Sequence, residues 1–228
     1  MVLLESIATA AAGVVFGLAL AAPPGPMNAV IAEESVVGGW RSGFTAGLGA
    51  MVADACFLVL SLAGVVALLQ RSPTLQGVLV GIGGLLLWYF AIGAFRDRAA
   101  GFRSAGTVAA ERRGFAKAFT LAITNPYQIL FWLTVGVGLL EPGRIDVFAT
   151  ALSADSSLAG VVVVQTGTPL LLVGLFGGIL VWITGFPAAL TAGAARTDRL
   201  APAVSTLSAL AYAGFGTLFV ADAVRTLL

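Results

Sequence analysis

Long uncharged stretches dominate this chain, and short clusters of charged residues separate them. A helix needs about 20 mostly apolar residues to cross a lipid bilayer, because each residue adds about 1.5 Å of rise. We therefore predict an all-α integral membrane protein with about six transmembrane helices in a single membrane domain, residues 1–228. The predicted spans are 6–32, 43–69, 73–95, 117–140, 168–192 and 201–224, and the polar segment 96–116 is predicted to be a cytoplasmic loop.

The uncharged run from Ser156 to Ala195 holds 40 residues, too few for two spans and the loop between them. Pro169 follows Thr168 in this run, and a proline suits the first turn of a helix, where its missing N–H costs nothing. We place one span there. Residues 156–167 are left open among a half-helix, a surface helix and a loop.

Two predicted spans contain residues that interrupt a helix. Pro23-Pro24-Gly25-Pro26 lies in the first span, where the prolines remove backbone donors and clash with the preceding turn. A half-helix that includes Asn28 resumes beyond this break. In the fourth span, Asn125-Pro126 predicts a second break, with Asn125 capping the freed groups. At membrane depth such backbone is tolerated where it faces protein or a water-filled cavity, so each break indicates either a packing kink or a solute site.

The two interrupted helices are three spans apart, so they run in opposite directions through the bilayer. Ala19-Leu20-Ala21 precedes the first break, and the similar Thr120-Leu121-Ala122 precedes the second. This arrangement favours a 3+3 inverted repeat with broken helices 1 and 4, as in transporters whose binding site lies between paired interrupted helices. Two unrelated kinks are the alternative.

Asp54 is the charged residue within the otherwise uncharged run from Ser42 to Gln70. An unpaired charge near the bilayer centre costs at least about 2.5–3.5 kcal/mol. Asp54 must therefore face the protein interior, pair with another group or carry a proton. A carboxyl group in that position can hold a substrate ammonium, transfer a proton, or simply hydrogen-bond a neighbouring helix.

Composition removes several classes of function. Hydrophobic residues make up 59% of the chain and charged residues 10%, against about 25% charged in an average soluble domain. The net charge of +1 provides no basic face for nucleic acid. The chain has no histidine and one cysteine, Cys56, which excludes histidine-ligated haem or zinc, a Ser-His-Asp triad and an internal disulfide. We expect no enzyme activity, no cofactor and no metal site.

The basic residues predict the orientation in the membrane, because Lys and Arg favour the cytoplasmic side. Three basic residues fall on the side of the N-terminus and nine on the opposite side: Arg41, Arg96, Arg98, Arg103, Arg112, Arg113, Lys117, Arg196 and Arg199. We predict a plasma-membrane protein with both termini outside. We also expect the N-terminal segment to be retained, since its start carries Glu5 and no basic residue. Gly-x-x-x-Gly spacings at Gly13, Gly43 and Gly174 allow either a homodimer face or internal packing.

Three blocks of this sequence resemble the lysine exporter (LysE/RhtB-type) family of amino-acid exporters. The first block is Pro24-Gly25-Pro26-x-Asn28 with Gly39-Trp40-Arg41-x-Gly43-x3-Gly47-x-Gly49-x4-Asp54, the second is Gly81-x-Gly83-Gly84 with Tyr89, Gly93, Arg96 and Arg98, and the third is Phe115-x3-Phe119-x5-Asn125-Pro126-x4-Phe131. The resemblance implies a six-helix exporter of amino acids or similar small polar solutes, coupled to a proton or ion gradient. Tyr127 stands where the family commonly has a basic residue, and the segment Glu141–Gly167 is longer than expected.

We therefore expect a proton-coupled exporter that works by alternating access, with the lipid bilayer and a small solute as its partners. The expected solute site consists of Pro24, Gly25, Pro26, Asn28, Asp54, Asn125 and Pro126, with Asp54 as the group for proton coupling. The alternatives are a transporter of inorganic divalent cations and a non-transporting membrane scaffold.

Overall fold

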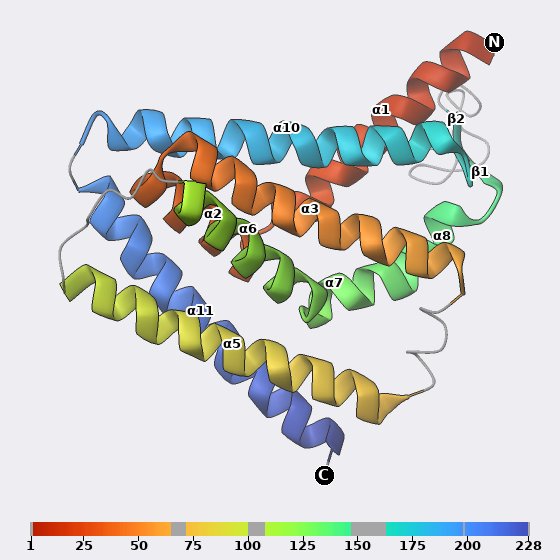
Figure 1. Ribbon diagram of the computed structural model, residues 1–228. Helices are drawn as coiled ribbons and strands as arrows, with labels where there is room; N and C mark the ends of the chain where they lie inside the picture. Colours follow the sequence, from red (N-terminus) through yellow and green to blue (C-terminus); the bar gives the residue numbers. More distant parts are fainter. Residues whose placement is uncertain (1, 65–71, 100–107, 147–162, 198, 228) are drawn as a thin grey trace. The chain divides into compact units, whose positions relative to one another are not determined.

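A computed structural model describes residues 2–64, 72–99, 108–146, 163–197 and 199–227 (Figure 1). This part of the chain is almost entirely helical, which confirms the predicted all-α class, and a single two-stranded sheet is the exception within it. The chain divides into two compact units. The first consists of Met1–Ala22 and Thr134–Trp182, and the second consists of Pro23–Leu133 and Ile183–Leu228. The first change of unit coincides with the predicted break at Pro23.

Close packing of glycines joins two helices in the first unit. This unit contains α1 (Val2–Ala21), α8 (Val137–Leu140) and the first part of α10 (Pro169–Ala194). Gly13 and Gly17 of α1 lie directly against the α10 backbone, and Gly174 and Gly178 of α10 lie against the α1 backbone. A Cβ atom at any of these four positions would collide with main-chain atoms. These two Gly-x-x-x-Gly motifs therefore serve internal packing.

The segment before α10 corrects one expectation. Strand β1 (Gly143–Asp146) pairs antiparallel with strand β2 (Val163–Thr166), so residues 163–166 form neither a helix nor an irregular loop. The physical reason is the run of β-branched valines, which favours an extended backbone when a partner strand is available. Residues 147–162, which include most of the segment left open above, lie outside the described part of the chain.

The second unit is a helical bundle. Helix α5 packs along α11, α3 packs along α6, and α2 contacts α3, α6 and α11. The helices of this unit are α2 (Pro26–Gly38), α3 (Trp40–Leu62), α5 (Pro73–Ala99), α6 (Val108–Ile123), α7 (Pro126–Phe131) and α11 (Leu200–Leu227), with the last part of α10. A turn at Ala63–Gly64 follows α3, and residues 65–69 of the predicted second span lie outside the described residues.

Both predicted helix breaks are present. Helix α1 ends at Ala21 and α2 begins at Pro26, while α6 ends at Ile123 and α7 begins at Pro126. A π-helical segment, η1 (Trp132–Gly136), follows α7 and leads into α8. Such π-turns often occur at functional sites.

The predicted loop 96–116 is shorter in the structure than we expected. Helix α5 extends to Ala99 and α6 begins at Val108, so residues 108–116 are helical, and residues 100–107 lie outside the described part. Lys and Arg favour a helix even where they do not suit lipid, and the cytoplasmic position of this segment stays a prediction.

Five described helices are long and apolar enough to cross a membrane: Leu3–Ala21, Trp40–Leu62, Pro73–Gly93, Pro169–Ala194 and Leu200–Leu227. The predicted span 117–140 is divided among α6, α7, η1 and α8. Large apolar side chains on these helices are exposed, including Val59, Leu85 and Leu210, as expected for surfaces in contact with lipid. The protein is therefore a multi-pass membrane protein.

Gly49→Ala is expected to destabilise the second unit. Alanine improves helix propensity by up to about 1 kcal/mol, but a Cβ at Gly49 would collide with the Phe115 carbonyl of α6, and overpacking costs about 1–3 kcal/mol. Gly93→Ala in α5 is the matched control, because a Cβ there meets no atom within 4 Å. Thermal unfolding in detergent should give a lower midpoint for Gly49→Ala than for Gly93→Ala, and equal midpoints would contradict the close approach.

Candidate functional site

The first break leaves the start of α2 without a side-chain cap. Gly25 is the N-cap residue in an extended conformation, with Pro26 at the first helical position. Asn28 Nδ2 donates a hydrogen bond of 2.8 Å to the Pro23 carbonyl oxygen, which the break has freed from helical bonding. Pro24 is exposed, whereas Pro26 is buried. The side chain of Asn28, in the first turn of α2, thus stabilises the interrupted backbone that precedes this helix.

The second break is capped in the way the sequence predicts. Asn125 is buried, and its Oδ1 accepts a hydrogen bond of 3.1 Å from the Tyr127 backbone N–H. Pro126 occupies the first helical position, as Pro26 does at the first break. Asn125 therefore sets the direction in which α7 leaves the break, because an N-cap fixes the first turn of its helix.

Asp54 lies in the interior of the second unit, with 5% of its surface exposed. It is three residues, about 4.5 Å, past the middle of α3. Its Oδ1 accepts two hydrogen bonds, one of 2.7 Å from Gln128 Nε2 and one of 2.8 Å from Trp132 Nε1. These hydrogen bonds join α3 to the α7–η1 segment that follows the second break.

Both donors to Asp54 are neutral, so they orient the carboxyl group without balancing its charge. Among the described residues, the ion pairs are Lys117–Glu33 and Arg144–Glu5, and Asp54 takes part in neither. A carboxylate without a counter-charge is costly inside a membrane. The group can lower that cost by taking up a proton or by receiving a cationic part of a solute.

Gln128 and Trp132 were absent from the predicted site, although the sequence carried a signal for them. Their spacing of four residues predicts that they share one face of an α-helix, and in the structure Gln128 lies on α7 and Trp132 begins η1. An amide and an indole N–H in an apolar span need acceptors. Asp54 is an acceptor of the kind that they require, but nothing in the linear sequence places α7 beside α3.

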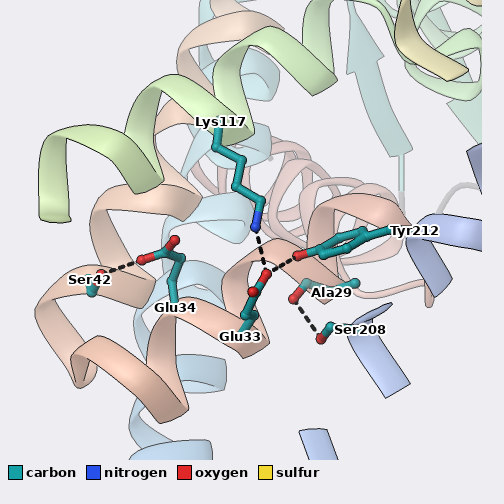
Figure 2. A network of polar contacts seen from close by, with 7 residues as sticks. All are labelled: Ala29, Glu33, Glu34, Ser42, Lys117, Ser208 and Tyr212. Carbon is teal, nitrogen blue, oxygen red and sulfur yellow. Dashed lines mark hydrogen bonds and ion pairs between the residues drawn. The ribbon is translucent and has the colours of Figure 1, made fainter. Parts of the chain in front are cut away.

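A second polar cluster links α2, α6 and α11. Figure 2 shows Lys117 and Tyr212 converging on Glu33, whose Oε2 lies 2.6 Å from Lys117 Nζ and accepts a 2.6 Å hydrogen bond from the Tyr212 hydroxyl. The Glu33 and Lys117 side chains are only 15% and 14% exposed. Lys117 was counted among the basic residues that predict the orientation, and Glu33 had no predicted partner. The contact between them could not be predicted, because its residues come from helices distant in sequence.

Neighbouring contacts attach α2 on two further sides. Ser42 Oγ donates to Glu34 Oε2 at 2.6 Å, which ties α2 to α3. Ser208 Oγ donates to the Ala29 carbonyl at 3.0 Å, which ties α2 to α11 (Figure 2). The half-helix that follows the first break is thus held by polar contacts to three helices of its unit.

Comparison with known proteins agrees with the resemblance seen in the sequence. Residues 18–164 match the model of the family described as LysE type translocator. The chain is 26% identical over 220 residues to YcgF of Bacillus subtilis, which is provisionally named an amino acid efflux protein, and the match covers 94% of this chain and 96% of YcgF.

Two further relatives match a shorter part. An uncharacterised membrane protein of Pseudomonas aeruginosa is 31% identical over 137 residues, covering 58% of this chain and 62% of that protein. The leucine efflux protein of Enterobacter sp. strain 638 is 27% identical over 126 residues, which cover 52% of this chain and 57% of that protein. No solved structure matches the chain. The matched segment includes both helix breaks and Asp54, and on this evidence the chain belongs to the LysE type translocator family.

Proposed function

We propose that this protein exports amino acids or similar small polar solutes from the cytoplasm by proton-coupled alternating access. The family and the names of its relatives support a transporter of amino acids. The observation that carries the proposal is Asp54, a carboxyl group buried near the middle of α3 and bonded by two neutral donors from the segment after the second break. A packing contact alone would not require an ionisable group at that depth.

The solute would bind where the two breaks expose backbone. N–H groups in the first turn of a helix have no intrahelical acceptor, and with the helix dipole they attract a carboxylate. In our proposal the solute carboxylate lies at Gly25–Asn28, where Pro24 and Pro26 keep the helix interrupted. Asn125, next to Pro126, provides a second polar contact. Asp54 holds either the solute ammonium or the coupling proton.

Alternating access would follow from an inverted repeat. Its support is local: both half-helices begin with a proline at the first helical position, directly after an N-cap residue, Gly25 or Asn125. Paired half-helices of this kind can enclose a binding site that opens first to one side of the membrane and then to the other.

In the proposed orientation both termini are outside the plasma membrane, since nine basic residues of twelve then lie in the cytoplasm. An epitope tag at either end should be accessible on intact cells, and a tag that requires permeabilisation would reverse the orientation. A homodimer stays a prediction. The glycine motifs of α1 and α10 do not support it, because they are used within one chain.

Counterflow in proteoliposomes tests the proposed function. Vesicles with the purified protein are loaded with one unlabelled amino acid at a time and diluted into its labelled form, with and without a pH gradient. We expect labelled L-leucine or a related amino acid to accumulate, and an imposed pH gradient to change the extent. Empty vesicles are the control. The absence of counterflow for every proteinogenic amino acid would contradict the proposal.

A further inference from the structure

The ammonium group of Lys117 occupies a site built by residues of other helices. Its Nζ lies 2.6 Å from Glu33 Oε2, 5.0 Å from the ring centre of Phe90 and 4.8 Å from the ring centre of Tyr212. One carboxylate and two aromatic faces form the usual environment for binding an ammonium ion. Four helices, α2, α5, α6 and α11, contribute one side chain each.

The charge pair is largely buried, and the tyrosine that contacts it lies near the middle of its helix. Tyr212 is 12 residues, about 18 Å, beyond the start of α11 and 15 residues before its end. Apolar side chains of the same volume would often stabilise such a position as well or better, because burying two charges costs several kcal/mol per ion. Structural need alone therefore does not explain the pair.

A polar stripe on α11 adjoins the same site. Ser205, Ser208 and Tyr212 lie at intervals of three and four residues, so they share one helix face. Ser208 and Tyr212 donate hydrogen bonds to α2, at the Ala29 carbonyl and at Glu33 (Figure 2). Ser205 is 4% exposed, and its hydroxyl has no hydrogen-bond partner within the described residues. A buried polar atom without a partner is rare and calls for an explanation, and a polar group of a bound solute would provide one.

We propose that Glu33, Phe90 and Tyr212 form a second solute site, in which the ammonium of an α-amino acid replaces that of Lys117. Lys117 then turns to the carboxylate of the same solute. This proposal rests on the proposed amino-acid export. The site lies on α2 about 10 Å beyond Pro26, seven residues along the helix. With an ammonium site at Glu33, Asp54 is free to carry the coupling proton.

A zwitterion fits this arrangement because its entry separates Lys117 from Glu33, and its own two charged groups then pair with both side chains. An amine without a carboxylate would have to displace Lys117 and leave the lysine unpaired in the interior. An acid without an ammonium would leave Glu33 unpaired. Either loss costs far more than the pair itself contributes, since the remaining charge is buried without a partner. The site should therefore select molecules that carry both groups.

Ligand-induced thermal stabilisation of the purified full-length protein tests this assignment. The probes are L-leucine, 3-methylbutylamine, which is leucine without its carboxylate, and 4-methylpentanoate, which is leucine without its ammonium. For wild type we expect leucine alone to stabilise. Lys117→Met should weaken leucine binding at least about tenfold and allow the amine to bind, because the ammonium site is then empty. Glu33→Gln should abolish binding of both.

Two further variants separate binding from structure. Arg113→Met removes an exposed positive charge one turn earlier on α6 and should leave leucine binding unchanged. The exchange Glu33→Lys with Lys117→Glu retains an ion pair between α2 and α6. Its thermal midpoint should therefore be closer to wild type than those of the two single variants, while leucine binding should stay lost. It also replaces Lys117→Met as the test if that variant does not fold.

The outcomes distinguish this site from the proposed function. If wild type shows no amino-acid counterflow, the proposed function fails and this site fails with it. If wild type transports leucine but Lys117→Met binds leucine as before and rejects the amine, the site alone is wrong. Recovery of leucine binding in the charge exchange would likewise contradict the assignment of the solute ammonium to Glu33, Phe90 and Tyr212.

Discussion

Asp54→Asn is expected to leave the protein folded and to reduce export driven by a pH gradient at least about tenfold, a change of about 1.4 kcal/mol in the barrier. Asparagine has nearly the same shape, and its Oδ1 can still accept the hydrogen bonds of Gln128 and Trp132. The variant removes the negative charge and the ability to take up and release a proton. The thermal midpoint should change by less than about 4 °C, which corresponds to about 1 kcal/mol for a chain of this size.

The comparison of two assays assigns the role of Asp54. If Asp54 carries the proton, counterflow without a gradient should persist in Asp54→Asn while gradient-driven export is lost. If Asp54 holds the solute ammonium, both assays should fail. Asp222→Asn is the matched control, since Asp222 is an exposed carboxyl group of α11. Unchanged gradient-driven export by Asp54→Asn would remove this residue from the mechanism.

The parts of the fold that depend on local chemistry could be predicted from the sequence. Proline has no N–H and clashes with the preceding turn of a helix, so the Pro-Pro-Gly-Pro cluster and the Asn-Pro pair predicted the breaks before Pro26 and Pro126. A lone proline is a weaker signal, since Pro187 lies inside α10 without ending it. The burial of Asp54 follows from its apolar surroundings in α3, because an acid there must turn away from lipid. The hydrogen bond from Asn125 to the first turn of α7 is a local preference of the same kind.

Pairings between distant segments could not be predicted in this way. Lys117 and Glu33 are 84 residues apart, and Tyr212 lies 179 residues from Glu33. Each of these residues has an ordinary explanation by itself at the edge of an apolar run, and only the packing of α2 against α6 and α11 brings them together. The β1–β2 pairing was missed for the same reason, because a valine run of four residues suits a helix or a strand until its partner is known.

Replacing Pro23-Pro24-Gly25-Pro26 by four alanines is expected to abolish transport while preserving or raising thermal stability. In a helix interior, alanine is favoured over proline by about 3 kcal/mol and over glycine by about 1 kcal/mol, so α1 and α2 should fuse. The fused helix would span 37 residues, Val2 to Gly38, or about 55 Å, against a hydrocarbon thickness of about 30 Å. The Pro23 carbonyl would then bond within the helix and no longer accept from Asn28.

The proposed mechanism requires this loss, because a continuous helix offers no free N–H groups to a solute carboxylate at Gly25–Asn28. Pro169→Ala is the matched control: Pro169 also begins a helix, but it follows the Thr168 cap of α10 rather than a break. Circular dichroism should show helix gained in the alanine variant only, and counterflow should be lost in that variant only. If the fused variant gained helix and still transported leucine at the wild-type rate, the break would be a packing kink and the solute would bind elsewhere.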